Sequence, residues 1–203
     1  MHRAIVAGAA LIVAATACQK KTTPPPGEND PHPDVVLETT KGRIVLELDR
    51  NAAPKTVANF VTHVDQHFYD GLVFHRVIPG FVIQAGLQRP DRGRRISSAP
   101  PVPNEANNGL KNVRGSVALA RTMDPQSGGV QFYVNLKDNK QLDFKDSTVA
   151  GWGFCVFGRV KEGMDVADAI GRSRTRPDDS PVEPVVITRA YVDTTAAPAK
   201  ETT

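Results

Sequence analysis

The spacing of hydrophobic positions along the chain alternates between a period near two and a period near four. Eight short stretches, apolar or alternating apolar with polar, predict β-strands. They cover residues 35–39, 43–49, 73–77, 81–83, 116–120, 130–136, 154–160 and 185–192. Helical spacing at 54–66 and 164–170 predicts two helices, and Pro54 suits the first turn of the first one. The pattern therefore predicts a mainly β domain with two helices.

One stretch, residues 73–86, combines this pattern with chemistry. It predicts a strand, a tight turn at Pro79-Gly80 and a second strand. Because the connection is short, the two strands must be neighbours. This brings a guanidinium, an aromatic ring and an amide together, from Arg76, Phe81 and Gln84. On local pattern alone, a core hairpin with an arginine paired to a carboxylate at its rim is the favoured interpretation of the stretch.

Composition and charge exclude several kinds of partner. The 203 residues suit one domain with extensions, and the net charge of +3 is small, so no polyanion is required. The basic run at residues 89–95 contains no aromatic side chains for base stacking, so we interpret it as a solvated loop and expect no nucleic-acid partner. Two cysteines, Cys18 and Cys155, are too few for a metal site, and Cys155 fits a small buried hydrophobe.

The N-terminal segment has the features of an export signal. A short basic start precedes an apolar stretch at residues 4–13 and the small residues Ala15-Thr16-Ala17, so residues 1–17 predict a signal peptide. The cysteine that follows resembles a bacterial lipobox, in which Cys18 carries lipid and anchors the chain to a membrane. An ordinary secreted protein is the alternative. Gln19 resembles the pattern of outer-membrane sorting, so we expect the periplasmic side of a bacterial membrane.

Two polar segments flank the predicted domain. Residues 18–33 hold five prolines and no apolar periodicity, which indicates an extended tether after the lipidated Cys18. Residues 194–203 predict a disordered tail. The folded domain is expected at residues 34–193.

Five motifs of this domain resemble, in order and spacing, those of the cyclophilins, the peptidyl-prolyl cis/trans isomerases. They lie at residues 74–86, 104–110, 115–121, 131–134 and 156–160. The resemblance implies a closed eight-stranded antiparallel β-barrel capped by two α-helices. A barrel of this size is filled by its own side chains, so a ligand would bind on the outer wall.

The resemblance also implies a chemistry without metal or cofactor. Arg76 would donate a hydrogen bond to the twisted prolyl amide, and Gln84 would hold Arg76 or the substrate carbonyl. Residues that would form the proline pocket are Phe81, Val82, Tyr133, Leu142 and Phe154. Gln131 and the backbone around Ala120 and Arg121 would position the peptide. The partners would be proline-containing and unfolded exported chains, bound by a monomer that assists their folding.

Some alternatives stay open at this point. A cyclophilin fold could serve as a binding module for proline-containing segments, with catalysis incidental. The position of His75 beside Arg76 suggests acid–base catalysis. Strand alternation directs the two side chains to opposite faces, so we interpret His75 as structural. His63 and His67 have the spacing of two metal ligands on a helix, and surface histidines are the favoured interpretation. Gln141 stands where cyclosporin-sensitive relatives carry a tryptophan, which predicts weak cyclosporin binding.

Overall fold

The structure is a computed structural model that describes residues 30–195. The predicted signal peptide, the lipidation site at Cys18, most of the tether and most of the tail therefore lie outside the described residues. Within the described part, no helix is both long and apolar enough to cross a membrane.

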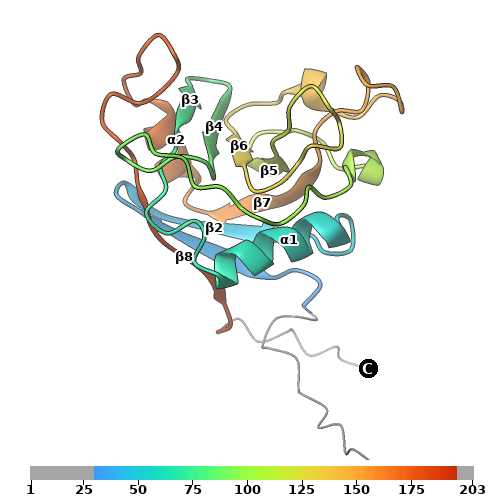
Figure 1. Ribbon diagram of the computed structural model, residues 1–203, viewed down its shortest axis with the longest axis horizontal. Coiled ribbons are helices and arrows are strands. Elements are labelled where there is room, and N and C mark those ends of the chain that lie inside the picture. The colour runs from blue at the N-terminus through green and yellow to red at the C-terminus, as the bar shows by residue number, and fades with distance from the viewer. Residues whose placement is uncertain (1–29, 196–203) are drawn as a thin grey trace, which may run out of the picture.

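A single eight-stranded antiparallel sheet forms the framework of the described chain (Figure 1). Its order is β3-β4-β6-β5-β7-β2-β1-β8, which agrees with the predicted strand number. In chain order the strands are β1 (Asp34–Thr39), β2 (Gly42–Leu48), β3 (Arg76–Ile78), β4 (Val82–Ala85), β5 (Ser116–Leu119), β6 (Phe132–Asn135), β7 (Val156–Glu162) and β8 (Ile187–Asp193). The mainly β prediction is confirmed.

The sheet curls into a barrel that is open along one side, which corrects the prediction of a fully closed barrel. β3 and β8 are the two ends of the ladder and do not pair along their lengths. The two edges are nevertheless linked by backbone hydrogen bonds between the residues that precede β3 and β8. Val73 forms a bridge with Val186, and the Phe74 N–H donates to the Val185 carbonyl at 3.0 Å. β3 begins at Arg76, three residues later than predicted, because residues 73–75 form this seam.

Two α-helices cover the sheet, as predicted. α1 (Pro54–Asp65) contacts β8, and α2 (Met164–Gly171) contacts β2, β3 and β4. Two short 3-10 helices, η1 (Ala106–Asn108) and η2 (Lys140–Leu142), lie in the loops.

The first turn of α1 is capped from a distant loop. Its N-cap residue, Ala53, offers no side-chain acceptor. The carboxylate of Glu105 accepts instead from the Lys55 N–H at 3.1 Å, the Thr56 N–H at 2.9 Å and the Thr56 hydroxyl at 2.8 Å. The first N–H groups of a helix have no partner within it, and a negative charge there is favourable. This contact joins α1 to the asparagine-rich segment at residues 104–112.

Aromatic rings fill the inside of the sheet. Phe60 of α1 lies 5.2 Å from Phe132 of β6 and 5.2 Å from Phe157 of β7, measured between ring centroids. All three side chains are fully buried. Because these rings fill the interior, a peptide has to bind outside it.

The last residues of the predicted tether belong to the folded domain. The carbonyls of Pro31 and Pro33 accept hydrogen bonds from the N–H groups of Arg50 and Leu48, at 2.9 and 3.0 Å. The domain therefore begins at least three residues before the predicted boundary at Asp34.

Candidate functional site

A row of paired residues crosses the outer face of the sheet. Arg76 of β3 pairs with Gln84 of β4, Gln84 with Tyr133 of β6, and Tyr133 with Ala118 of β5. Ala118 in turn pairs with Val156 of β7. Residues paired across strands project from the same face of a sheet. The row therefore begins with charged and amide groups and continues into an apolar surface.

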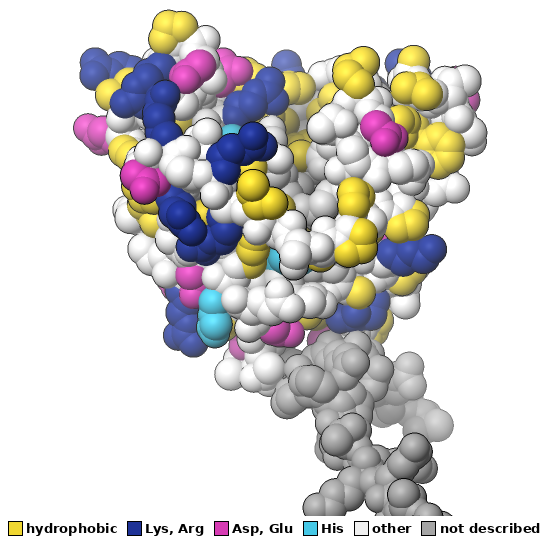
Figure 2. All heavy atoms as spheres, in the orientation of Figure 1, with side chains coloured by type: hydrophobic (Ala, Val, Ile, Leu, Met, Phe, Trp, Pro, Cys, Tyr) yellow, Lys and Arg dark blue, Asp and Glu magenta, His cyan; other side chains and the backbone are white. Residues whose placement is uncertain are grey.

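The apolar end of this row is a hydrophobic cluster separate from the core, here called the outer cluster. Its buried members are Val82, Ala118, Tyr133 and Val156, and its partly buried members are Phe81, Leu110, Ala120, Leu142 and Phe154. All five residues predicted for a proline pocket belong to it. In Figure 2 the surface is hollowed between two lobes, with basic side chains gathered on one lobe and hydrophobic ones on the other.

Tyr133 faces outward and Phe132 inward, as strand alternation predicts. Tyr133 belongs to the outer cluster, whereas Phe132 belongs to the main core. The ring of Phe154 meets Tyr133 edge to face at 5.9 Å, and the Arg121 guanidinium lies over Phe154 at 4.5 Å. Arg121 is held there by a bond from its Nε to the Gly153 carbonyl at 2.8 Å. Stacking of this kind fixes the orientation of the pocket rings.

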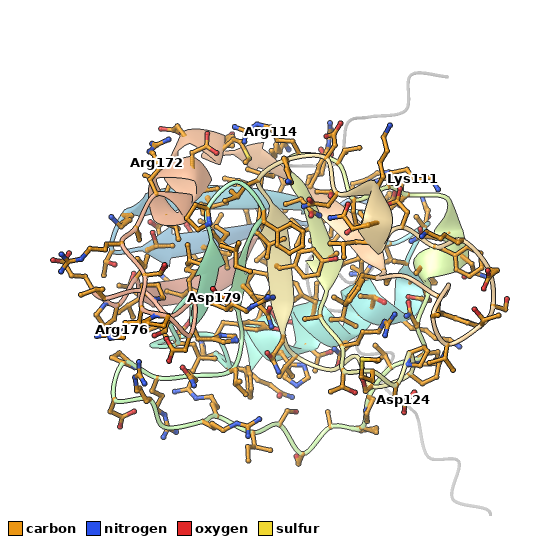
Figure 3. All side chains as sticks on the ribbon, turned by 90° about the horizontal axis from the view of Figure 1, so that it is seen from above. Lys111, Arg114, Asp124, Arg172, Arg176 and Asp179 are labelled. Carbon is orange, nitrogen blue, oxygen red and sulfur yellow. The ribbon has the colours of Figure 1, made fainter. Side chains whose placement is uncertain are left out.

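Arg76 lies at the polar rim of the outer cluster. Its Nε is 3.4 Å from Oδ2 of Asp179, and its side chain is 42% exposed. Among the described residues this is the only partner of its guanidinium, so both Nη groups are available to a ligand. In Figure 3, Asp179 lies beside β3, the strand that carries Arg76.

Gln84, expected to hold Arg76 or the substrate carbonyl, makes no hydrogen bond to Arg76 within residues 30–195. Its Nε2 donates to Oε1 of Gln131 at 3.0 Å. Gln131 can approach because Gly86, at φ +96°, has no side chain, and a Cβ there would lie 2.5 Å from the Val130 carbonyl oxygen. The two glutamines therefore form one amide pair beside Arg76.

His75 is partly buried next to this amide pair. Burial lowers its pKa to about 4, and the nearby Arg76 and Arg94 charges act in the same direction, whereas Gln131 and the Val73 backbone partly oppose them. Its Nδ1 is buried without a hydrogen-bond partner among the described residues. The ring is therefore neutral near pH 7 and cannot act there as an imidazolium acid, which supports a structural role.

An asparagine network behind Tyr133 could not be predicted from the sequence. The Tyr133 hydroxyl donates to Oδ1 of Asn112 at 2.8 Å, and Asn135 donates to the same atom at 3.2 Å. Asn139 donates to Asn135 at 2.7 Å and to the Phe81 carbonyl at 3.2 Å. Asn112 is 21 residues from Tyr133 along the chain and Phe81 is 58 residues from Asn139, and buried asparagines give no periodic signal. The network fixes Tyr133 and Phe81 against each other.

His63 lies on α1, whereas His67 follows the end of that helix, and only His67 is a surface residue. His63 is only 2% exposed and contacts the Asn59 carbonyl and the Ser97 hydroxyl, each at 2.8 Å. This corrects the surface interpretation for His63, whereas His67 is exposed and lies 3.3 Å from Asp70. No cluster of three or more potential metal ligands occurs within residues 30–195.

Three further residues have ordinary structural roles. Cys155 is a free, buried thiol whose pKa is raised to about 11 by burial, as its apolar surroundings predicted. Gln141 lies in η2 and is exposed, with a bond of 3.4 Å to Asn139. The Trp152 Nε1 donates to the Asn104 carbonyl at 3.2 Å, which ties its loop to the asparagine-rich segment.

Comparisons with known proteins agree on one family. The family model "Cyclophilin type peptidyl-prolyl cis-trans isomerase/CLD" matches residues 34–192. "Peptidyl-prolyl cis-trans isomerase cyp18" of Streptomyces antibioticus is 51% identical over 163 residues, which cover 78% of this chain and 97% of the relative. "Peptidyl-prolyl cis-trans isomerase B" of Escherichia coli is 44% identical, with 75% of this chain and 95% of the relative covered.

A solved structure supports the same fold. The crystal structure of a Cryptosporidium parvum cyclophilin-type isomerase, determined in the presence of the dipeptide Ala-Pro, matches with a TM-score of 0.68. The match covers 79% of this chain and 98% of the other at 22% sequence identity. At this identity the likeness concerns the fold.

Proposed function

This chain belongs to the cyclophilin-type peptidyl-prolyl cis-trans isomerases, and we propose that it isomerises X-Pro bonds of exported proteins with Arg76 as the decisive hydrogen-bond donor. The observation that best supports this proposal is the pairing of Arg76 with Gln84 at the rim of the outer cluster. The cluster offers an apolar surface to a proline ring, and the charged donor lies beside it.

The reaction itself requires no nucleophile. Rotation about an X-Pro bond breaks amide resonance, and the barrier is about 18–20 kcal/mol. A site accelerates the rotation when it binds the twisted amide more tightly than either planar form. In the twisted amide the prolyl nitrogen regains a lone pair and accepts a hydrogen bond that the planar amide cannot accept.

Arg76 has the properties that such a donor needs. A guanidinium carries several N–H groups in a fixed plane and keeps its charge. The bond from Arg76 Nε to Asp179 leaves both Nη groups without a partner among the described residues. The ion pair with Asp179 also limits the motion of the side chain, so less conformational entropy is lost when the donor binds the amide.

The remaining site residues divide into two groups by chemistry. The apolar side chains Phe81, Val82, Leu142 and Phe154 would surround the proline ring together with Tyr133. Gln84, Gln131 and Arg121 lie at the polar edge, where they would bind the peptide backbone on either side of the proline. No metal or cofactor takes part in this scheme.

The cellular setting is also part of the proposal. Residues 1–17 have the pattern of a signal peptide, and Cys18 follows its small residues as in a lipoprotein. We propose a monomer anchored through Cys18 on the periplasmic side of the outer membrane, where it assists the folding of exported chains. Mass spectrometry of the N-terminal peptide should show a mature chain that begins with an acylated Cys18. An unmodified N-terminus at another residue would contradict the anchor, and Cys18→Ser supplies the unacylated control.

The isomerase mechanism is tested by the rate of cis-to-trans exchange in a short Ala-Pro peptide. Arg76→Ala should lower kcat/KM by about 100- to 1,000-fold, the usual cost of losing one donor to a transition state. Arg92→Ala is the matched control, since Arg92 lies 3.6 Å from Asp178 and takes no part in the site. Tight peptide binding by the wild type without faster exchange would instead support a binding module.

A further inference from the structure

A second cavity opens next to the candidate site. It has a volume of about 330 Å³ and shares Gln84, Ala120 and Gln131 with that site. Its other walls come from residues 87–101, the basic loop, and from residues 121–130. A peptide with its proline against the outer cluster would therefore present a neighbouring side chain to this cavity, here called the basic pocket.

The basic pocket is lined by three arginines, Arg94, Arg95 and Arg121, and by no carboxylate. The nearby Asp124 uses its Oδ1 to accept from the Gln126 N–H at 2.9 Å. In Figure 3, Asp124 lies well apart from Asp179, which is engaged by Arg76. The positive charge of the pocket is thus not balanced from within its own walls.

Two of the three arginines are already engaged. Arg95 donates to the carbonyls of Phe68 and Asp70, both at 2.7 Å. Arg121 donates to the carbonyls of Gly153 and Thr122 and stacks on a ring. Arg94 has no side-chain hydrogen bond or ion pair within residues 30–195, although its charge is close enough to His75 to lower the pKa of that ring.

The backbone holds Arg94 in a defined position. The bridge between Gln88 and Arg94 closes a small hairpin, and the Arg89 N–H donates to the Gly93 carbonyl at 2.8 Å. The next residue is held as well, because the Arg95 N–H donates to the Leu87 carbonyl at 2.8 Å. The unengaged guanidinium therefore extends from an ordered loop.

We propose that the basic pocket selects substrates with an Asp or Glu side chain within a few residues of the proline, and that Arg94 is the ion partner of this carboxylate. The inference rests on the proposed isomerase function and adds a substrate preference to it. A guanidinium binds a carboxylate through two parallel hydrogen bonds. The hydroxyls of Thr122 and Ser127 in the same pocket bond to each other at 2.8 Å and supply a polar wall.

The test compares peptides that differ in one side chain. Glu, Gln or Lys is placed at each position from three before to three after the proline, and kcat/KM for exchange is measured with the purified protein. At one position or more the Glu peptide should exceed the Gln peptide by about 2- to 5-fold, as expected for a solvent-accessible ion pair. High salt should reduce this ratio because it screens the charges.

Variants identify the residue responsible. Arg94→Gln should bring the Glu-to-Gln ratio close to one, and Arg94→Glu should favour the Lys peptide instead. Arg92→Gln is the matched control and should keep the wild-type ratio, since Arg92 is bound to Asp178 and Ser180 outside the pocket.

Equal rates for Glu and Gln peptides at every position would overturn the proposal, as would a preference that survives in Arg94→Gln. The Gln peptide reports isomerase activity independently of the pocket. If the wild type accelerates that peptide without a Glu preference, only the basic pocket proposal fails. If it accelerates no peptide, the proposed function fails as well.

Discussion

Arg76 and Gln84 lie directly opposite each other in the antiparallel ladder between β3 and β4. Their side chains consequently leave the same face of the sheet, beside Tyr133 on the next strand. The Pro79-Gly80 turn produces this register, because the Phe81 N–H bonds to the Ile78 carbonyl at 3.0 Å with Gly80 at φ +64°. A positive φ at this turn position requires little energy only for glycine.

Loss of the amide pair should impair catalysis without unfolding the protein. In Gln84→Ala the Gln131 amide loses its partner at 3.0 Å, and the peptide is held less well beside Arg76. We expect kcat/KM to fall by about 10- to 100-fold, the range for a displaced substrate. Gln66→Ala, at the exposed end of α1, is the control. Wild-type exchange rates in Gln84→Ala would show that the pair has no positioning role.

The ring and the hydroxyl of Tyr133 should have different roles, which one substitution can distinguish. Tyr133→Phe removes the bond to Asn112 but keeps the ring in the outer cluster. Asn112 Oδ1 still accepts from Asn135, so the free energy of unfolding should fall by only about 1 kcal/mol. Urea unfolding measures this change, and peptide exchange should stay close to the wild-type rate. A large loss of activity in Tyr133→Phe would assign the hydroxyl a direct part in the reaction.

Glu105 should stabilise α1 from outside the helix. Glu105→Ala removes the acceptor of three hydrogen bonds at the first turn, so we expect a loss of about 1–3 kcal/mol in the free energy of unfolding. Glu105→Gln keeps one acceptor oxygen and should lose less. Thermal unfolding of both variants beside the wild type provides the comparison. Equal stability of Glu105→Ala and wild type would contradict the capping role.

Stability should fall in mild acid because of His75. Its pKa is about 4 in the folded protein, below the usual value of 6.5. Above pH 6.5 the ring is neutral in both states, and its contribution is complete. As the pH falls from 6.5 towards 4, the unfolded chain takes up a proton that the folded protein does not, and the loss approaches about 3 kcal/mol.

This pH dependence is measured by urea unfolding at several pH values between 7 and 4.5. His75→Gln should show a shallower decline than the wild type. The exposed His67→Gln variant should retain the wild-type decline. If the curves of His75→Gln and wild type run parallel through this range, the buried neutral ring is not the cause.

The periodicity of hydrophobic positions and the turn residues predicted most of this fold, because the spacing of apolar residues determines which face of each strand is buried. The pattern at residues 130–136 separated the outward Tyr133 from the inward Phe132 correctly. The opening of the barrel is not predictable from local pattern, since the strands left at the two edges of the sheet are decided by pairing between residues distant in sequence. The sequence predicts a surface position for His63 that is wrong, because a histidine at helical spacing gives no sign of a buried partner such as Ser97.

The candidate site was predictable in composition but not in its contacts. The side chains of the proline pocket could be nominated because they follow a familiar family pattern. The bond between Gln84 and Gln131 and the asparagines behind Tyr133 depend on tertiary contacts that no local pattern encodes. The separate engagement of Arg95 and Arg121, which leaves Arg94 available, likewise becomes visible only in the folded chain.

The most direct test of the central claim is the exchange rate of an Ala-Pro peptide while it is bound, measured by NMR together with its affinity. Arg76→Lys keeps a positive charge but lacks the planar set of donors. If Arg76 acts on the twisted amide, Arg76→Lys and Arg76→Ala should both slow exchange in the bound peptide by about 100-fold or more, with little change in Kd. Bound-state exchange at the wild-type rate in either variant, with only weaker binding, would contradict the account and make Arg76 a residue for peptide binding alone.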